Sequence, residues 1–140
     1  MMKNCYDIIV VGGGHAGCEA ALAAARLQQQ VLIISLHKQH IGRLSCNPAI
    51  GGLAKGNLVR EIDALGGAMA KVADRSSIQF RRLNTRKGLA VQASRAQVDI
   101  DIYPQEMQKI IHQHSNIDFY EGEAASIQTN NGQVSAILTA

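Results

Sequence analysis

Residues 6–17 read YDIIVVGGGHAG and decide the fold. The run over residues 6–11 is β-branched and apolar on both faces, which is typical of a strand buried in a parallel sheet. It leads directly into Gly12, Gly14 and Gly17, which have the spacing of the dinucleotide fingerprint G-x-G-x-x-G. The residues that follow, CEAALAAARL, are strong helix formers. We therefore expect a strand, a glycine-rich turn and a helix, in this order.

Each glycine of this turn has a separate physical role in a dinucleotide site. Gly12 would allow the tight turn, Gly14 would let a pyrophosphate approach the backbone, and Gly17 would let the helix pack against the strand. The free N–H groups at the start of the helix would then bind the phosphates. The alternative is a glycine-rich turn that binds no ligand. The candidate cofactor-binding residues here are Gly12, Gly13, Gly14, His15, Ala16 and Gly17. His15 could also act in catalysis, although a residue in such a loop more often only shapes the turn.

The segment Val31–Ser35 is a second buried strand, and it completes a right-handed parallel strand, helix, strand unit. Dinucleotide-binding sheets usually carry an acidic residue near this position, which binds the ribose hydroxyls. Ser35 stands there instead, and this makes an ordinary NAD dehydrogenase a poorer interpretation. Just before the strand, Gln28 occupies the place where a helix-ending glycine is favoured.

Two helices are expected in the middle of the chain, after a loop over residues 37–52. The first covers residues 53–65, with Leu58, Ile62 and Leu65 along one face. The second covers residues 94–114, and Pro104 should break or kink it near Tyr103. Strands are predicted over residues 78–83 and 117–120. A hairpin is predicted over residues 124–139, because its Asn-Gly pair supplies the positive φ of a tight turn.

Composition limits the class of protein. The chain has 140 residues, 46% apolar and 18% charged, which fits one folded domain and excludes a disordered chain. It has neither an apolar run long enough to span a membrane nor a signal peptide, so we expect a soluble cytoplasmic protein. Three cysteines without a C-x-x-C pair predict neither a disulfide framework nor a metal site.

Positive charge gathers in one part of the chain. Residues 75–98 contain no Asp or Glu but hold 6 of the 14 basic residues. These six are Arg75, Arg81, Arg82, Arg86, Lys87 and Arg95. A solvated basic face and a surface for a phosphate-bearing partner are both compatible with this pattern.

Several motifs together resemble one family. These are GGGHAG at 12–17, SCNPAIGG at 45–52, KGNLVREIDALGG at 55–67, IQFRRLN at 78–84 and SRAQ at 94–97. In this order and spacing they resemble the N-terminal part of the flavin-dependent tRNA uridine 5-carboxymethylaminomethyl modification enzyme, also called glucose-inhibited division protein A. The resemblance covers essentially the whole chain, whereas family members are several-fold longer.

The resemblance implies a fold and an activity. Residues 1–140 would be the incomplete N-terminal part of an FAD-binding, Rossmann-like, doubly wound parallel sheet with a C-terminal β-hairpin, and no second domain. The full-length family forms a homodimer, works with a tRNA-modification GTPase and uses FAD, NADH and a methylene-folate. Together they add a carboxymethylaminomethyl-type group to the wobble uridine of tRNA. The NADH-binding segment and the tRNA-contacting region would lie beyond Ala140.

The resemblance also implies roles for single residues. Ala125 matches a position whose backbone touches the cofactor, and the family tends to carry a small hydroxyl residue at the position of Ser35. Cys46 matches one of two cysteines regarded as catalytic, and the second has no counterpart in this chain. Arg82, Lys87 and Arg95 become candidates for contacts with flavin phosphate or tRNA.

The simplest interpretation of Cys46 is a buried thiol that only packs in the core, because free cysteine is among the most buried residue types. Pro48 and the pair Gly51-Gly52 instead favour a turning loop before a helix, where a thiol near Lys55 could be reactive. For Cys5 and Cys18 packing is the better interpretation.

The chain also departs from the family pattern. Leu89 and Gln92 stand where the family usually has proline and arginine, and Ile100 and Pro104 stand in place of an arginine-containing helix. The alternative function is therefore a truncated, catalytically inactive FAD-domain fragment that acts at most as a binding or vestigial module.

Overall fold

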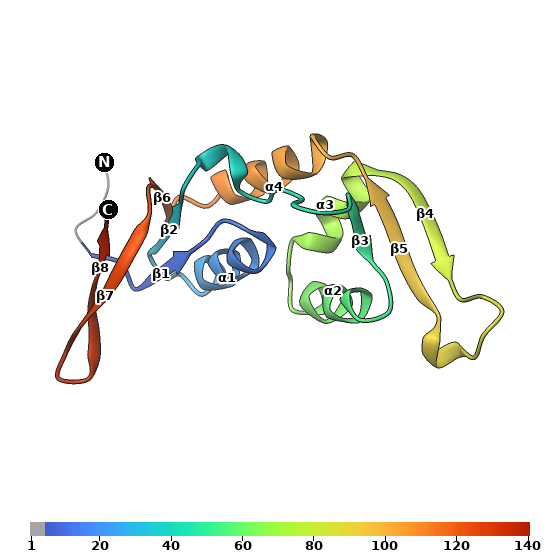
Figure 1. Cartoon of the computed structure of the whole chain (residues 1–140), viewed down its shortest axis with the longest axis horizontal. Helices are drawn as coiled ribbons and strands as arrows, with labels where there is room; N and C mark the ends of the chain where they lie inside the picture. Colours follow the sequence, from blue (N-terminus) through green and yellow to red (C-terminus); the bar gives the residue numbers. More distant parts are fainter. Residues whose placement is uncertain (1–4) are drawn as a thin grey trace.

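The computed structural model describes residues 5–140, which form an elongated molecule with strands at both ends (Figure 1). At one end three parallel strands form a sheet in the order β1 (Ile8–Val11), β2 (Val31–Ser35) and β6 (Ile117–Glu121). Helix α1 (His15–Arg26) connects β1 to β2. This is the predicted doubly wound α/β arrangement, and the predicted strand at residues 117–120 is confirmed as β6.

Burial differs between the two predicted strands. In β2 the side chains of residues 31–34 are buried, as the sequence predicts. The expected burial of β1 is wrong, because Ile8, Ile9 and Val11 are exposed. Strand β1 has a single neighbour in the sheet and is therefore an edge strand. Parallel sheets usually bury both faces, whereas this strand leaves three of its four apolar side chains exposed.

A second sheet, at the other end of the molecule, is antiparallel (Figure 1). Its order is β3 (Ala49–Gly51), β5 (Ala93–Val98) and β4 (Ser77–Leu83), and β4 is the strand predicted for residues 78–83. The predicted helix over residues 94–114 is wrong in its first part, which is β5. Ala, Arg and Gln in this segment favour a helix locally, but pairing with two strands places it in a sheet.

The helix in this region is shorter, α4 (Ile102–His112), and Pro104 does not break it. Pro104 is the third residue of the helix, where its missing N–H would have no intrahelical acceptor in any case. Asp99 fixes the start of α4, since its Oδ1 accepts 2.9 Å hydrogen bonds from the N–H groups of Asp101 and Ile102. The proline therefore marks a helix start and not a kink.

Two helices lie between β3 and β4 in sequence, α2 (Lys55–Ala64) and α3 (Met69–Ser76). The buried residue of α2 is Val59, whereas Leu58 and Leu65 on the predicted apolar face are exposed. Short 3₁₀ turns follow β2 and precede β5, η1 (Lys38–His40) and η2 (Leu89–Val91).

The predicted C-terminal hairpin is confirmed as β7 (Ala124–Asn130) paired with β8 (Gln133–Thr139). Asn131 and Gly132 lie between the strands with φ of 49° and 77°. Positive φ at both central residues is the requirement of a two-residue hairpin turn.

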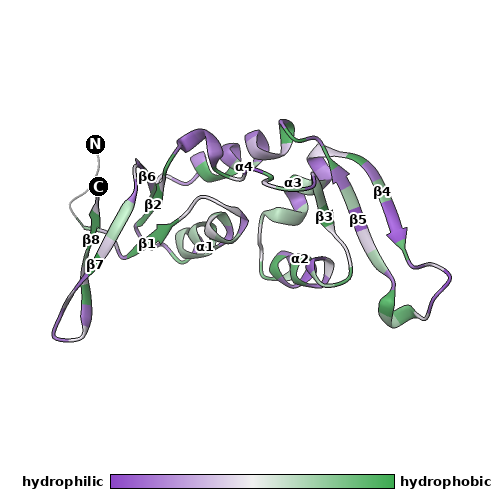
Figure 2. Cartoon of the chain, in the orientation of Figure 1, coloured by the Kyte–Doolittle hydropathy of each residue, from purple (hydrophilic) through white to green (hydrophobic). Residues whose placement is uncertain are grey.

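One connected cluster of buried side chains joins the two ends of the molecule. It includes Leu22 and Ile33 near the parallel sheet, Val72 and Val98 near the antiparallel sheet, and Met107 of α4. Figure 2 shows that hydrophobic residues gather on β1 and β2, whereas hydrophilic residues mark the end of β4. Within residues 5–140, no helix is long and apolar enough to cross a membrane.

Candidate cofactor site at the glycine-rich turn

The turn after β1 has the geometry that its glycines predict. Gly12 has φ of +104°, a left-handed conformation that favours glycine, and its N–H donates a 2.8 Å hydrogen bond to the carbonyl of Ile34. A Cβ at Gly12 or at Gly14 would meet no atom within 4 Å. The backbone at both positions is therefore open to an approaching group.

Gly17 is required for a different reason, the packing of α1 on β1. A Cβ at this position would lie 2.0 Å from the carbonyl oxygen of Gly12 and 3.4 Å from Cγ1 of Val10. Gly13 is also enclosed, because a Cβ there would lie 2.8 Å from Cγ1 of Ile41. The outer two glycines of the motif thus serve the turn and the packing, while Gly14 leaves space, as the fingerprint predicts.

The start of α1 offers free hydrogen-bond donors. The helix begins at His15, and the first bond to its N-cap runs from the N–H of Cys18 to the carbonyl of Gly14, at 2.9 Å. The N–H groups of His15, Ala16 and Gly17 therefore have no intrahelical acceptor. No acidic residue lies in the first turn. This helix N-terminus is suited to an anion such as pyrophosphate.

A groove of about 410 Å³ opens beside the turn. Gly12, Gly13 and Gly14 form part of its wall, with Ser35 at the end of β2. Its volume lies within the ~300–1,000 Å³ typical of small-molecule pockets. Ligands of open α/β sheets bind outside the carboxyl ends of the strands, and this groove lies at such an edge.

The opposite wall comes from the segment after β6, which the sequence did not single out. Gly122, Glu123 and Ala124 line the groove there. The N–H of Gly122 donates a 2.9 Å hydrogen bond to the carbonyl of Ser35, which holds this segment beside β2. The sequence did hold a polar signal here, since Glu121 and Glu123 follow the strand predicted over residues 117–120. The missing step was the strand order that places β6 next to β2.

Two residues singled out by sequence have different places in this groove. The Oγ of Ser35 donates to the carbonyl of His37 at 3.3 Å, and Ser35 lines the groove. Ala125 is exposed and does not line it, although its neighbour Ala124 does. The pairing of β7 with β8 shifts register between Ala124 and Ser126, so Ala125 lies at an irregularity of the strand.

His15 packs on the protein side of the turn. Its ring lies edge-on to Tyr103 of α4, with centroids 5.5 Å apart, and its Nδ1 is buried without a hydrogen bond within residues 5–140. Burial, followed by the charge of Lys55, lowers the pKa of His15 below its ordinary value of 6.5. A neutral, packed imidazole fits the turn-shaping interpretation better than the catalytic one.

The three cysteines lie in different environments. Cys46 is exposed on the loop between η1 and β3, which argues against the packing interpretation. Cys18 is buried as expected, and burial raises the pKa of its thiol to about 12. The packing prediction for Cys5 is wrong, because Cys5 is exposed. It precedes β1 and lines an open groove beside β8.

The structure does not bring every predicted site residue together. Cys46 does not line the groove at the glycine-rich turn, and the Nζ of Lys55 donates to the carbonyl of Ala49 at 3.3 Å. In the part of the chain that the structure describes, no cluster of His, Cys, Asp and Glu could hold a metal ion.

Comparison with known proteins places this geometry in a family. The family model described as glucose inhibited division protein A matches residues 7–140. A tRNA uridine 5-carboxymethylaminomethyl modification enzyme of Desulfotalea psychrophila is 54% identical over 139 residues, which is 99% of this chain and 22% of that protein. The chain thus spans about a fifth of the length of this relative.

Solved structures agree with the sequence comparison. The GidA structure of Aquifex aeolicus has a TM-score of 0.91 and 51% identity, covering 96% of this chain and 22% of that chain. A probable FAD-dependent monooxygenase of Pseudomonas aeruginosa, PqsL, has a TM-score of 0.64 at 14% identity, covering 96% of this chain and 38% of that chain. The latter likeness concerns the fold alone. The chain belongs to the glucose inhibited division protein A family.

Proposed function

We propose that this chain is the FAD-binding part of a flavoenzyme that adds a carboxymethylaminomethyl group to the wobble uridine of tRNA. The observation that carries the proposal is the glycine-rich turn, whose open backbone and free helix N-terminus border a groove of about 410 Å³. The names of the relatives, which are tRNA modification enzymes, support the substrate.

In this proposal the backbone N–H groups of His15, Ala16 and Gly17 bind the pyrophosphate of FAD, beside Gly12, Gly13 and Gly14. Ser35 and Ala125 contact other parts of the cofactor. The residues present fit such a group, because the open space at Gly14 admits it and the helix dipole favours its charge. Bound FAD would supply the redox chemistry of the reaction.

Cys46 is the proposed catalytic residue, as a thiol that faces the substrate. Its exposure supports this role, since a nucleophile has to reach the uridine base. For the whole protein we propose NADH and a methylene-folate as further reactants, a tRNA-modification GTPase as partner and a homodimer in the cytoplasm. Residues 1–140 would form a single, incomplete domain in that assembly.

The exposed apolar side chains of β1 favour a second candidate. In this case the chain is an FAD-domain fragment that binds its cofactor weakly and does not catalyse, because the sheet lacks the cover that a doubly wound fold needs. Modified wobble uridine in cells whose only copy of the enzyme is this chain would rule out this candidate.

A chimaera tests the first candidate. The corresponding segment of the D. psychrophila relative is replaced by this chain, and tRNA nucleosides are analysed by mass spectrometry in cells that lack the enzyme. We expect the modified uridine to return, to disappear with Cys46→Ser and to persist with Cys5→Ser. The second variant is a matched control, because both thiols are exposed. Full modification in the Cys46→Ser chimaera would refute the catalytic role.

A further inference from the structure

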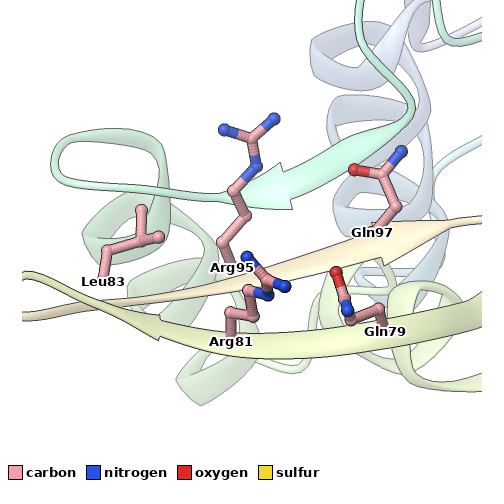
Figure 3. A pocket seen from close by; sticks show the side chains of 5 residues that line it. All are labelled: Gln79, Arg81, Leu83, Arg95 and Gln97. Carbon is pink, nitrogen blue, oxygen red and sulfur yellow. The ribbon is translucent and has the colours of Figure 1, made fainter.

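A pair of arginines faces one side of the antiparallel sheet, away from the glycine-rich turn. Arg81 of β4 and Arg95 of β5 lie side by side with Gln79 and Gln97 (Figure 3). Together with Leu83 they line a cavity of about 220 Å³. We call these five residues the arginine cluster. Its volume is below the ~300 Å³ at which pockets for drug-sized ligands begin, and it suits a small group.

The register of the sheet places like charges opposite each other. Arg81 pairs with Arg95 and Gln79 pairs with Gln97 across β4 and β5. Directly opposite side chains on one face have Cβ atoms about 4.5–5.5 Å apart, and like charges at that separation destabilise the sheet. A bound anion would remove this repulsion.

No acidic side chain compensates the two guanidinium groups. None of the ion pairs formed within residues 5–140 involves Arg81 or Arg95. The segment 75–98 also contains no Asp or Glu. Within residues 5–140 both guanidinium groups are therefore left to solvent or to an anionic partner.

The face that carries the cluster is open. The neighbouring strand β3 presents Ala49 beside Gln97 and Gly51 beside Arg95, so no long side chain covers the arginines from that side. The opposite face of β5 carries the buried Ala96, and helices α2 and α3 contact this strand. At β5 the face opposite to the cluster is therefore covered, whereas β4 is exposed on both faces.

The choice of anion follows from the donors and from the position of the cluster. Two guanidinium groups and two amides match the oxygens of a phosphodiester, for which arginine is the preferred partner. Figure 1 places β4 and β5 at one end of the molecule and the turn after β1 nearer to its middle, and the cluster shares no lining residue with the groove at that turn. The pyrophosphate proposed for that turn therefore does not account for this cluster.

We propose that the arginine cluster binds the phosphodiester backbone of RNA. The choice of RNA rests on the proposed function, whereas the need for an anion rests on the geometry alone. Arg81 and Arg95 are positioning residues here: they hold the backbone and do not read the base sequence. Arg82 points to the other face of β4, since side chains alternate along a strand.

The test measures binding of the full chain to a fluorescently labelled anticodon stem-loop RNA over a range of salt concentrations. Loss of one phosphate contact should reduce the slope of log K against log salt by about 1. We expect this reduction for Arg81→Gln and for Arg95→Gln, and about twice the reduction for the double variant. Arg82→Gln is the matched control, because it removes the same charge from the same strand on the other face.

The slope should be unchanged in Arg82→Gln, and Arg81→Lys should keep it, because lysine retains the charge. Arg95→Gln keeps the test decisive if Arg81→Gln does not fold, because each variant removes one of the two proposed contacts. An equal slope change in Arg82→Gln and Arg81→Gln, or no change in either cluster variant, would overturn the proposal. The proposal would also be overturned if the chain bound inorganic phosphate through both arginines but bound no RNA. An FAD titration of the same preparations separates the two ideas, since intact FAD binding with unchanged RNA slopes refutes only this inference.

Discussion

The substitution Gly17→Ala tests the packing of the glycine-rich turn most sharply. The new Cβ would lie 2.0 Å from the oxygen and 3.1 Å from the carbon of the Gly12 carbonyl. Both contacts are with backbone, so no side chain can rotate to relieve them, and α1 has to move away from β1. Overpacking of this kind costs about 1–3 kcal/mol. Alanine regains at most ~1 kcal/mol through its higher helix propensity.

We therefore expect Gly17→Ala to lower the free energy of unfolding by about 1–2 kcal/mol. It should also weaken FAD binding, because the N–H groups of the first turn move with the helix. Urea unfolding followed by circular dichroism measures the first effect, and a fluorescence titration with FAD measures the second.

Gly14→Ala is the matched control, because it should weaken FAD binding with little effect on stability. Gly14 has φ of −73°, and a Cβ there meets no atom within 4 Å. Stability should change by less than about 0.5 kcal/mol, while FAD binding weakens because the new methyl group occupies the open approach. Equal loss of stability in the two variants, or wild-type FAD binding in both, would refute this account of the glycines.

Three further predictions concern buried and exposed groups. Glu19→Ala should lower the free energy of unfolding by about 2–3 kcal/mol, because the Glu19 carboxylate accepts hydrogen bonds from the N–H groups that begin α3. Glu61→Ala, on the exposed side of α2, should have little effect in the same urea unfolding assay. Iodoacetamide should label Cys46 in the folded chain, but Cys18, whose pKa is raised to about 12, only after unfolding, as read by peptide mass spectrometry; equal labelling of both in the folded chain would contradict the structure. Burial lowers the pKa of His15, so its imidazole should titrate below pH 6.5 when followed by NMR. The contribution of His15 to the free energy of unfolding should be complete above pH 6.5 and decline as the pH falls. Titration at or above pH 6.5 would contradict this burial.

The strongest local signals in the sequence predicted the parallel sheet and the hairpin. The β-branched run of β2 and the Asn131-Gly132 pair each carry a conformational preference that their surroundings reinforce. The segment Ser94–Val98 has the opposite character. Its residues favour a helix locally, and only pairing with β3 and β4, which are distant in sequence, makes it a strand.

Which residues of α2 are buried also depends on tertiary contacts that could not be predicted from the sequence. Leu58 and Leu65 lie on a helical stripe, yet Val59 is the residue that packs into the core. A stripe of apolar residues indicates an amphipathic helix, but which residues touch the core depends on the neighbours of that helix.

The candidate site was predictable on one side only. The glycine spacing predicted the turn, because local steric constraints favour glycine at each of these positions. The wall formed by Gly122 and Glu123 was missed, because it comes from the segment after β6, more than a hundred residues after the glycine-rich turn. Cys46 was identified through the family resemblance, and its exposure could not be read from the loop sequence.

An NMR titration of the ¹⁵N-labelled chain with FAD tests the central claim most directly, because it reports each backbone N–H separately. We predict that the largest shifts occur at Gly12–Gly17, with further shifts at Ser35 and Gly122 across the groove. Absence of shifts at Gly12–Gly17, or shifts confined to other parts of the chain, would contradict the assignment of this turn as the cofactor site.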